Sequence, residues 1–114
     1  MNHEFIREYC LAKPSVTESF PFGDDTLVFK LYGKIFLLLS LDSSSFNVKC
    51  DPEKAVSYRN QFNDIVPGYH MNQRHWNTVS FSGMLSDDLI TEIIDHSYQM
   101  VLQSFPQKIQ AAHQ

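Results

Sequence analysis

Two strand-like runs separated by one glycine constrain the fold of this chain more than any other feature. Residues 26–32 and 34–41 are rich in Leu, Val, Phe, Ile and Tyr, and Gly33 stands between them. Two such runs around a glycine are typical of a β-hairpin, whose strands pair antiparallel. Residues 35–39 are apolar at every position, which predicts a central strand that is covered on both faces.

Helix-start signals surround this hairpin. Asn2 can cap a first helix, which Pro14 ends. The Asp-Pro-Glu run at residues 51–53 begins a second helix, and Ser86 caps a third. The predicted order is therefore helix, about four strands, helix, strand and helix, with hairpins dominating. We predict a single α+β domain over residues 1–114, an antiparallel sheet with helices packed on one face.

Charge is distributed unevenly along the chain. The formal net charge is −4 at pH 7, which disfavours indiscriminate nucleic-acid binding. The acidic surplus lies in residues 1–25 and 86–114, each with a net charge of −3, whereas residues 26–85 have six basic and four acidic residues. A weakly positive face formed by the middle of the chain is therefore compatible with the sequence.

The sequence predicts neither a membrane segment nor a secretory leader. The longest apolar run, residues 35–39, is far shorter than the roughly 20 residues that a membrane helix needs. Charged residues interrupt the N-terminus where a signal peptide has its apolar stretch. Cys10 and Cys50 are too few for a disulfide framework. We expect a monomer in the cytoplasm.

Patterns that carry catalysis are incomplete in this chain. The four glycines stand singly, so no phosphate-binding loop is present. Asp95, His96 and Ser97 have the residue types of a catalytic triad, but neighbouring helical positions point in different directions. His70 and His75 are five residues apart without a cysteine or glutamate nearby, which does not fit a zinc site. We therefore expect a non-enzymatic protein without a metal or cofactor.

A polar and aromatic loop precedes the last predicted strand. Residues 67–77 combine two histidines, an arginine, two aromatic residues and three amides, and residues 78–81 then alternate polar and apolar. Such side chains at the junction of a loop and a strand suit recognition of a planar or anionic partner. Tyr69 is equally compatible with a stacking platform and with the core. We expect Trp76 in the core, where it anchors the loop to the sheet.

Several short motifs occur in an order that resembles a known family. They are the Phe-Pro-Phe-Gly turn at residues 20–23, the hairpin at 33–36, the run at 48–53, the run at 67–72 with 75–77, and Ser97-Tyr98 with Val101. Together they resemble the MmcQ/YjbR family of small bacterial proteins, which carry a DNA-binding label. The resemblance implies a CyaY-like α/β sandwich, whose two β-hairpins are likened to the wings of double-wing DNA-binding domains. It implies no catalytic residues.

Our leading functional hypothesis is a small binding module whose ligand is nucleic acid. The residues expected to contact phosphate are Lys30, Lys34, Lys49 and Arg74. The residues expected to form or support the recognition loop are His70, Trp76 and Asn77. The rival hypothesis is a small-ligand or protein-interaction module that uses the 67–77 loop or a site beneath it. A pocket containing His70 and His75 would suit a small anion.

Overall fold

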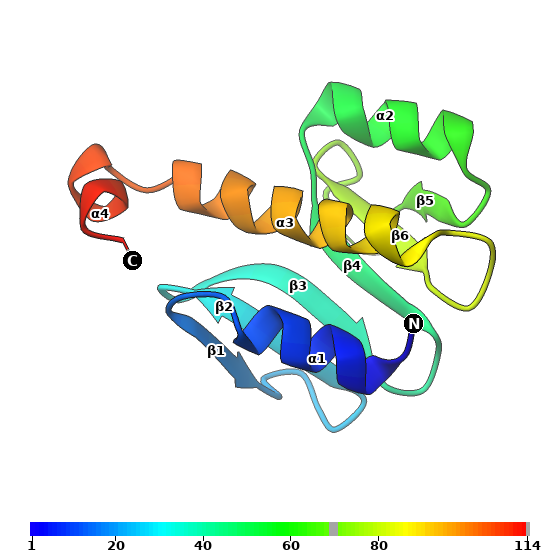
Figure 1. Ribbon diagram of the computed structural model, residues 1–114, viewed down its shortest axis with the longest axis horizontal. Coiled ribbons are helices and arrows are strands. Elements are labelled where there is room, and N and C mark those ends of the chain that lie inside the picture. Colours follow the sequence, from blue (N-terminus) through cyan, green and yellow to red (C-terminus); the bar gives the residue numbers. More distant parts are fainter. Residues whose placement is uncertain (69–70, 114) are drawn as a thin grey trace.

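The computed structural model describes residues 1–68 and 71–113 of the chain (Figure 1). Within these residues, four helices and six strands follow one another. In chain order they are α1 (His3–Leu11), β1 (Val16–Ser19), β2 (Thr26–Leu31), β3 (Lys34–Ser40), β4 (Ser45–Lys49), α2 (Pro52–Gln61), β5 (Ile65–Pro67), β6 (Trp76–Ser80), α3 (Asp87–Gln103) and α4 (Gln107–Ala112).

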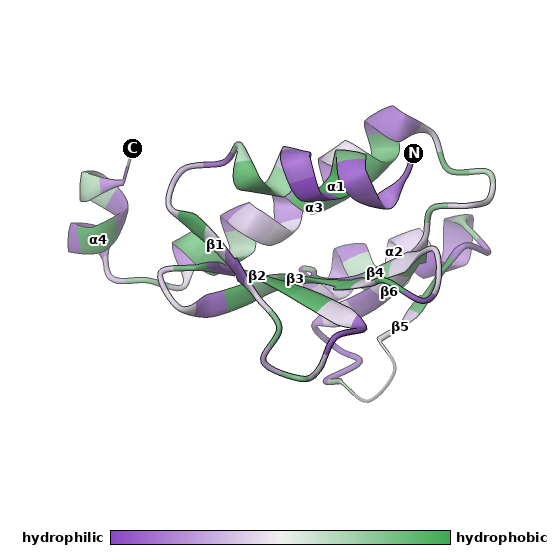
Figure 2. Ribbon diagram, turned by 90° about the horizontal axis from the view of Figure 1, so that it is seen from below, coloured by the Kyte–Doolittle hydropathy of each residue, from purple (hydrophilic) through white to green (hydrophobic). Residues whose placement is uncertain are grey.

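The six strands form one antiparallel sheet in the order β1-β2-β3-β4-β6-β5. α1 and α3 lie together on one face, whereas the loops after β1 and before β6 project from the opposite face (Figure 2). α2 packs beside β5 at the far end of the sheet (Figure 1). This arrangement confirms the predicted α+β fold, an antiparallel sheet with helices on one face. The face away from α1 and α3 is called the open face below.

Local capping explains where three of the helices begin. The side chains of Asn2, Asp51 and Ser86 each accept a hydrogen bond from the backbone N–H three residues later. Pro52 occupies the first turn of α2, where a missing N–H costs nothing. These are the helix starts that the sequence predicts. None of the helices in the described part of the chain is long and apolar enough to cross a membrane.

Two elements differ from the sequence prediction. α2 ends at Gln61, and Ile65–Pro67 then form the short edge strand β5. A proline is acceptable at a sheet edge because its missing N–H removes no bond from an inner ladder. After Pro106 the chain forms the short helix α4, which buries no residue. Propensity alone does not predict either element, because each is three to six residues long.

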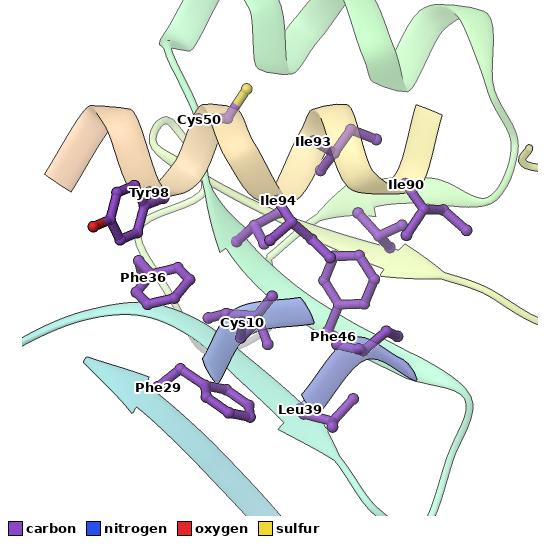
Figure 3. Packing of buried hydrophobic residues seen from close by; sticks show 14 of the residues in the cluster. Cys10, Phe29, Phe36, Leu39, Phe46, Cys50, Ile90, Ile93, Ile94 and Tyr98 are labelled. Carbon is purple, nitrogen blue, oxygen red and sulfur yellow. The ribbon is translucent and has the colours of Figure 1, made fainter. Parts of the chain in front are cut away.

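The core fills the space between the sheet and the helices. Figure 3 shows side chains of α1, α3 and the central strands interlocking there, with the rings of Phe36 and Tyr98 meeting edge to face at a centroid distance of 5.5 Å. Its largest completely buried side chains include Ile6, Phe29, Phe36, Phe46, Ile90 and Ile94. Burying each of them contributes roughly 1.5–3 kcal/mol, so this single layer of contacts holds the helices to the sheet.

A β-bulge divides the apolar run at residues 35–39 between the two faces. The register between β2 and β3 shifts within β2 and leaves Phe36 as the extra residue of β3. Phe36 and Leu37 consequently both face the helices and are fully buried. Ile35 and Leu38 lie on the open face and remain partly exposed. The prediction that both faces of this strand are covered is therefore wrong.

Candidate binding site on the open face of the sheet

The open face is hollowed into a groove between two loops. Its volume is about 690 Å³, which is within the range of about 300–1,000 Å³ that is typical of small-molecule sites. β2, β3, β4 and β6 form the floor, while Phe22 of the β1–β2 loop and Met71 of the segment before β6 form walls. Both loops project from this side of the sheet in Figure 2. Residues 1–68 and 71–113 therefore offer a concave surface that none of their helices covers.

The groove is lined by uncharged side chains within the described part of the chain. Leu38 pairs with Asn47 across β3 and β4, and Asn47 pairs with Thr78 across β4 and β6, so the three form a row across the floor. Thr78 Oγ1 donates a hydrogen bond to Asn47 Oδ1. This bond orients the amide and leaves the two Nδ2–H donors of Asn47 for a ligand or water.

A second row of the floor consists of hydroxyl groups. Thr26 pairs with Ser40 across β2 and β3, and both line the groove together with Ser45. Ser40 Oγ donates to Asp42 Oδ1 at 2.9 Å and accepts from Ser43 Oγ at 2.9 Å. Thr26 Oγ1 likewise donates to Asp25 Oδ1. Because each hydroxyl has only one proton, Thr26 and Ser40 offer a ligand acceptor lone pairs rather than donors.

Lys30, Lys49 and Trp76 form a third row on the open face. Lys30 pairs with the groove residue Ile35, and Lys49 pairs with Trp76. Directly paired residues project on the same face, and Lys49 shares the face of Asn47 because it stands two positions further along β4. β2 and β4 flank β3, so the backbones of the two lysines are about 10 Å apart at normal strand spacing. The structure therefore brings together three of the residues expected to bind nucleic acid.

Trp76 is partly exposed and does not belong to the core. Val79 is completely buried, and Asn77 is only 2% exposed. Alternation along β6 then turns Trp76 to the open face. The core prediction is therefore wrong, because the phase of the strand outweighs the general tendency of tryptophan to be buried.

Ser97 of α3 holds β3 and β4 together where the bulge interrupts their pairing. The ladder between the two strands stops at Leu37 and Val48. Beyond it, Ser97 Oγ donates to the Phe36 carbonyl at 2.5 Å and accepts from the Lys49 N–H at 2.9 Å. The completely buried hydroxyl thus replaces a ladder bond and fixes the backbone from which Lys49 projects.

Two of the predicted phosphate contacts lie elsewhere on the molecule. Lys34 Nζ donates to Ser104 Oγ at 3.1 Å and stands 4.5 Å from the centroid of the Phe105 ring, at the junction of α3 and α4. Arg74 lines a separate cleft beside α2, together with Arg59. Neither residue lines the groove on the open face.

Asn77, another residue expected in the recognition loop, does not line the groove. Asn77 is buried on the helix side, where its Nδ2 donates to the Ala55 carbonyl at 3.3 Å. It can therefore support the start of β6 but cannot touch a ligand on the open face. His70 and Tyr69 lie outside the described residues.

Asp95, His96 and Ser97 contact three different parts of the fold. Asp95 Oδ1 accepts a hydrogen bond from Tyr9 Oη at 2.7 Å. His96 Nε2 accepts one from the Asp51 N–H at 3.1 Å, at the start of α2. Burial, aided by the positive charge of Lys54, lowers the pKa of His96 from its ordinary value of 6.5. Each side chain is thus committed to a structural contact.

The thiols and the acidic groups offer no reactive or metal-binding cluster in the described ranges. Burial raises the pKa of Cys10 to about 12 and that of Cys50 to about 11, so both remain protonated thiols near neutral pH. Among residues 1–68 and 71–113, no three His, Cys, Asp or Glu side chains gather as a metal ion would require.

Sequence reasoning missed most of the groove because its residues come from four strands and two loops. Asn47 and Thr78 are polar residues that each precede a valine in a strand of alternating polar and apolar residues. This alternation indicates that they face away from the core. Nothing in the sequence places them beside each other, because that depends on the β4–β6 pairing. The sequence does offer one signal for the groove, the apolar turn that contains Phe22. An aromatic residue in a turn between Pro21 and Gly23 is expected to be exposed, and exposed apolar side chains often mark binding sites.

The fold and the groove define a class of protein: a small α+β domain with a helix-covered face and an open, concave sheet face. The YjbR family model matches residues 11–100, and the chain belongs to this family. It is 36% identical to YbdF of Escherichia coli O157:H7 over 110 residues, which are 95% of this chain and 90% of that protein. It is 30% identical to YjbR of Escherichia coli strain K12 over 105 residues, covering 90% of this chain and 89% of that protein.

Solved structures agree with this assignment. The crystal structure of Deinococcus radiodurans protein DR2400, with a domain described as DUF419, aligns with a TM-score of 0.91 at 31% identity, covering 97% of this chain and 86% of that one. A crystal structure of a Pseudomonas syringae protein aligns with a TM-score of 0.76 at 28% identity, covering 88% of this chain and 98% of that one. These relatives establish the family and the fold of the chain.

Proposed function

We propose that this chain is a non-enzymatic, monomeric and cytoplasmic binding module that holds single-stranded nucleic acid on the open face of its sheet. The observation that carries the proposal is the row formed by Lys30, Lys49 and Trp76 beside the groove. Lysines that contact phosphates and an exposed aromatic ring on which bases stack are the usual parts of a single-strand site.

The distribution of charge supports the same face. The acidic residues of α1 and α3 belong to the helix-covered side, among them Asp87 and Asp88 in the first turn of α3. The open face carries Lys30 and Lys49 and lacks acidic residues in the lining of the groove. A nucleic acid on this face is therefore separated from the acids of α1 and α3 by the sheet. Asp25 and Asp42 bond the hydroxyls of Thr26 and Ser40, so the phosphates belong at the lysine side of the face.

Titration of a fluorescent oligothymidylate at low salt tests the proposal. Lys49→Ala should weaken binding roughly 5- to 30-fold, the equivalent of about 1–2 kcal/mol. Lys34→Ala is the matched control, because it removes the same charge at the junction of α3 and α4. We expect Lys34→Ala to bind like the parent. If neither single- nor double-stranded probes bind at low salt, the proposal fails.

A small-ligand module is the second candidate, and the uncharged lining of the groove favours it. Met71 belongs to the 67–77 loop and forms one wall, so a small ligand would use that loop as the rival hypothesis expected. A thermal-shift screen with mononucleotides and small neutral metabolites distinguishes the candidates. Stabilisation by a small compound, without any binding of an oligonucleotide, would favour this second function.

A further inference from the structure

The three rows of the open face differ in chemistry from one side of the groove to the other. One row has the hydroxyls of Thr26, Ser40 and Ser45, and the opposite row has the two lysines. The row between them offers the apolar surface of Leu38 and the oriented amide of Asn47. A ligand that fits all three rows has a flat, neutral body with polar edges and one anionic group on the lysine side.

The walls of the groove add a surface for stacking. Phe22 is 64% exposed, so the ring contributes little to the core and remains available to a ligand. Met71 forms the other wall with a flexible thioether side chain that adapts to the faces of flat molecules. An exposed aromatic ring at the edge of a groove is the arrangement on which nucleobases stack.

We propose that the groove is a subsite for one nucleobase of the bound strand, with the base over Leu38 between Phe22 and Met71. Asn47 Nδ2 donates to a carbonyl of the base, so thymine, uracil and guanine fit better than adenine, which has no carbonyl. The phosphate attached to that nucleotide lies toward Lys30 and Lys49. This inference rests on the proposed single-strand function. It adds that the groove recognises one base of the bound strand.

An abasic oligonucleotide separates the base contact from the phosphate contacts. It has the same length and charge as the oligothymidylate and lacks only the bases. We expect it to bind at least about fivefold more weakly, because one stacked base contributes roughly a 5- to 150-fold change in affinity. Equal binding of the two probes would overturn the subsite together with stacking on Trp76, and would leave a single-strand site that holds only phosphates. If neither probe binds, both the subsite and the proposed single-strand function are overturned.

Two phenylalanines of the same loop provide a matched pair of variants. Phe22→Ala should weaken oligothymidylate binding roughly 5- to 150-fold and leave binding of the abasic probe unchanged. Phe20→Ala is the control, because Phe20 is also exposed, at 48%, and does not line the groove. If both variants bind oligothymidylate like the parent, the groove does not hold a base.

Asn47→Leu tests the direction of the amide. It should reduce the preference for oligothymidylate over oligoadenylate, while the melting temperature reports whether the sheet remains folded. An unchanged preference in a folded variant would overturn the assigned role of Asn47. Thymidine monophosphate, added as a competitor, should displace oligothymidylate more effectively than adenosine monophosphate does, and the reverse order would contradict the proposal.

Discussion

The contact between Gly68 and Trp76 sets the base of the loop that borders the groove. The Gly68 N–H donates to the Trp76 carbonyl at 2.9 Å. A Cβ atom at position 68 would stand 2.9 Å from the Trp76 Cβ and 3.0 Å from its carbonyl oxygen. Both distances are shorter than van der Waals contact, so the glycine is required by the close approach of two backbone segments.

We predict that Gly68→Ala destabilises the protein by about 1–3 kcal/mol, because the added methyl group forces β5 away from β6. Chemical denaturation gives the free energy of unfolding of the variant. Gly33→Asn is the comparison: Gly33 has a φ of +82° with nothing within 4 Å of an added Cβ, and asparagine tolerates this conformation. Equal losses in both variants would mean that the steric contact with Trp76 is unimportant.

His96 links α3 to the start of α2 in a manner that depends on pH. The pKa of His96 is lower in the folded protein than its ordinary value of 6.5. As the pH falls through 6.5, the unfolded chain therefore takes up a proton at this histidine before the folded protein does. Stability from this group is therefore fully present above pH 6.5 and is lost as the pH falls toward the folded-state pKa. Protonation also removes the acceptor that holds the Asp51 N–H.

We predict that the melting temperature falls between about pH 7.5 and about pH 5.5, and falls less in His96→Gln. Glutamine does not titrate, and its side-chain oxygen can accept a hydrogen bond. Subtracting one pH profile from the other therefore isolates the contribution of the histidine. Identical slopes in the two proteins would contradict this role of His96.

Among the elements, the pairing of β3 with β4 depends on a helix. Where the bulge ends the ladder, Ser97 supplies the missing bonds to the Phe36 carbonyl and the Lys49 N–H. This contact also supports the open face, because it fixes the end of β4 from which Lys49 projects.

We predict that Ser97→Ala destabilises the protein by about 1–3 kcal/mol, because it leaves two buried backbone groups without a partner. Thr91→Ala in the same helix is the control: its hydroxyl donates to the Asp88 carbonyl one turn earlier in α3, so we expect a loss of about 0.5 kcal/mol or less. Urea denaturation measures both. A Ser97→Ala protein as stable as the control would show that water replaces the hydroxyl.

Helix starts could be predicted from the sequence because a cap is a local interaction between residues three positions apart. Asn2, Asp51 and Ser86 all act as the sequence indicates. The bulge at Phe36 could not be predicted, because it depends on the register with β2 and on Ser97, which follows Phe36 by 61 residues. The burial of Trp76 was mispredicted for the same reason: it depends on the phase of a strand relative to its neighbours.

At the scale of the whole molecule, the fold separates charges that the sequence places in blocks. The acidic ends of the chain contribute α1 and α3, which cover one face, and the middle of the chain contributes most of the sheet. The charge distribution in the sequence is compatible with a weakly positive face. Only Lys30 and Lys49 lie on the open face, because Lys34 is at the junction of α3 and α4 and Arg74 is in the cleft beside α2. Two lysines limit the number of phosphates that this face can neutralise.

We therefore predict a shallow salt dependence for binding of oligothymidylate. Each neutralised phosphate of a single strand contributes about −0.7 to the slope of log K against log salt, so two contacts give about −1.4. The net charge of −4 should make binding of a duplex of equal length weaker, because a duplex brings twice the phosphate charge to a protein that repels it. Fluorescence anisotropy at several salt concentrations measures both quantities. A slope steeper than about −3, or a preference for duplex, would place the contact on another surface, such as the cleft between Arg59 and Arg74.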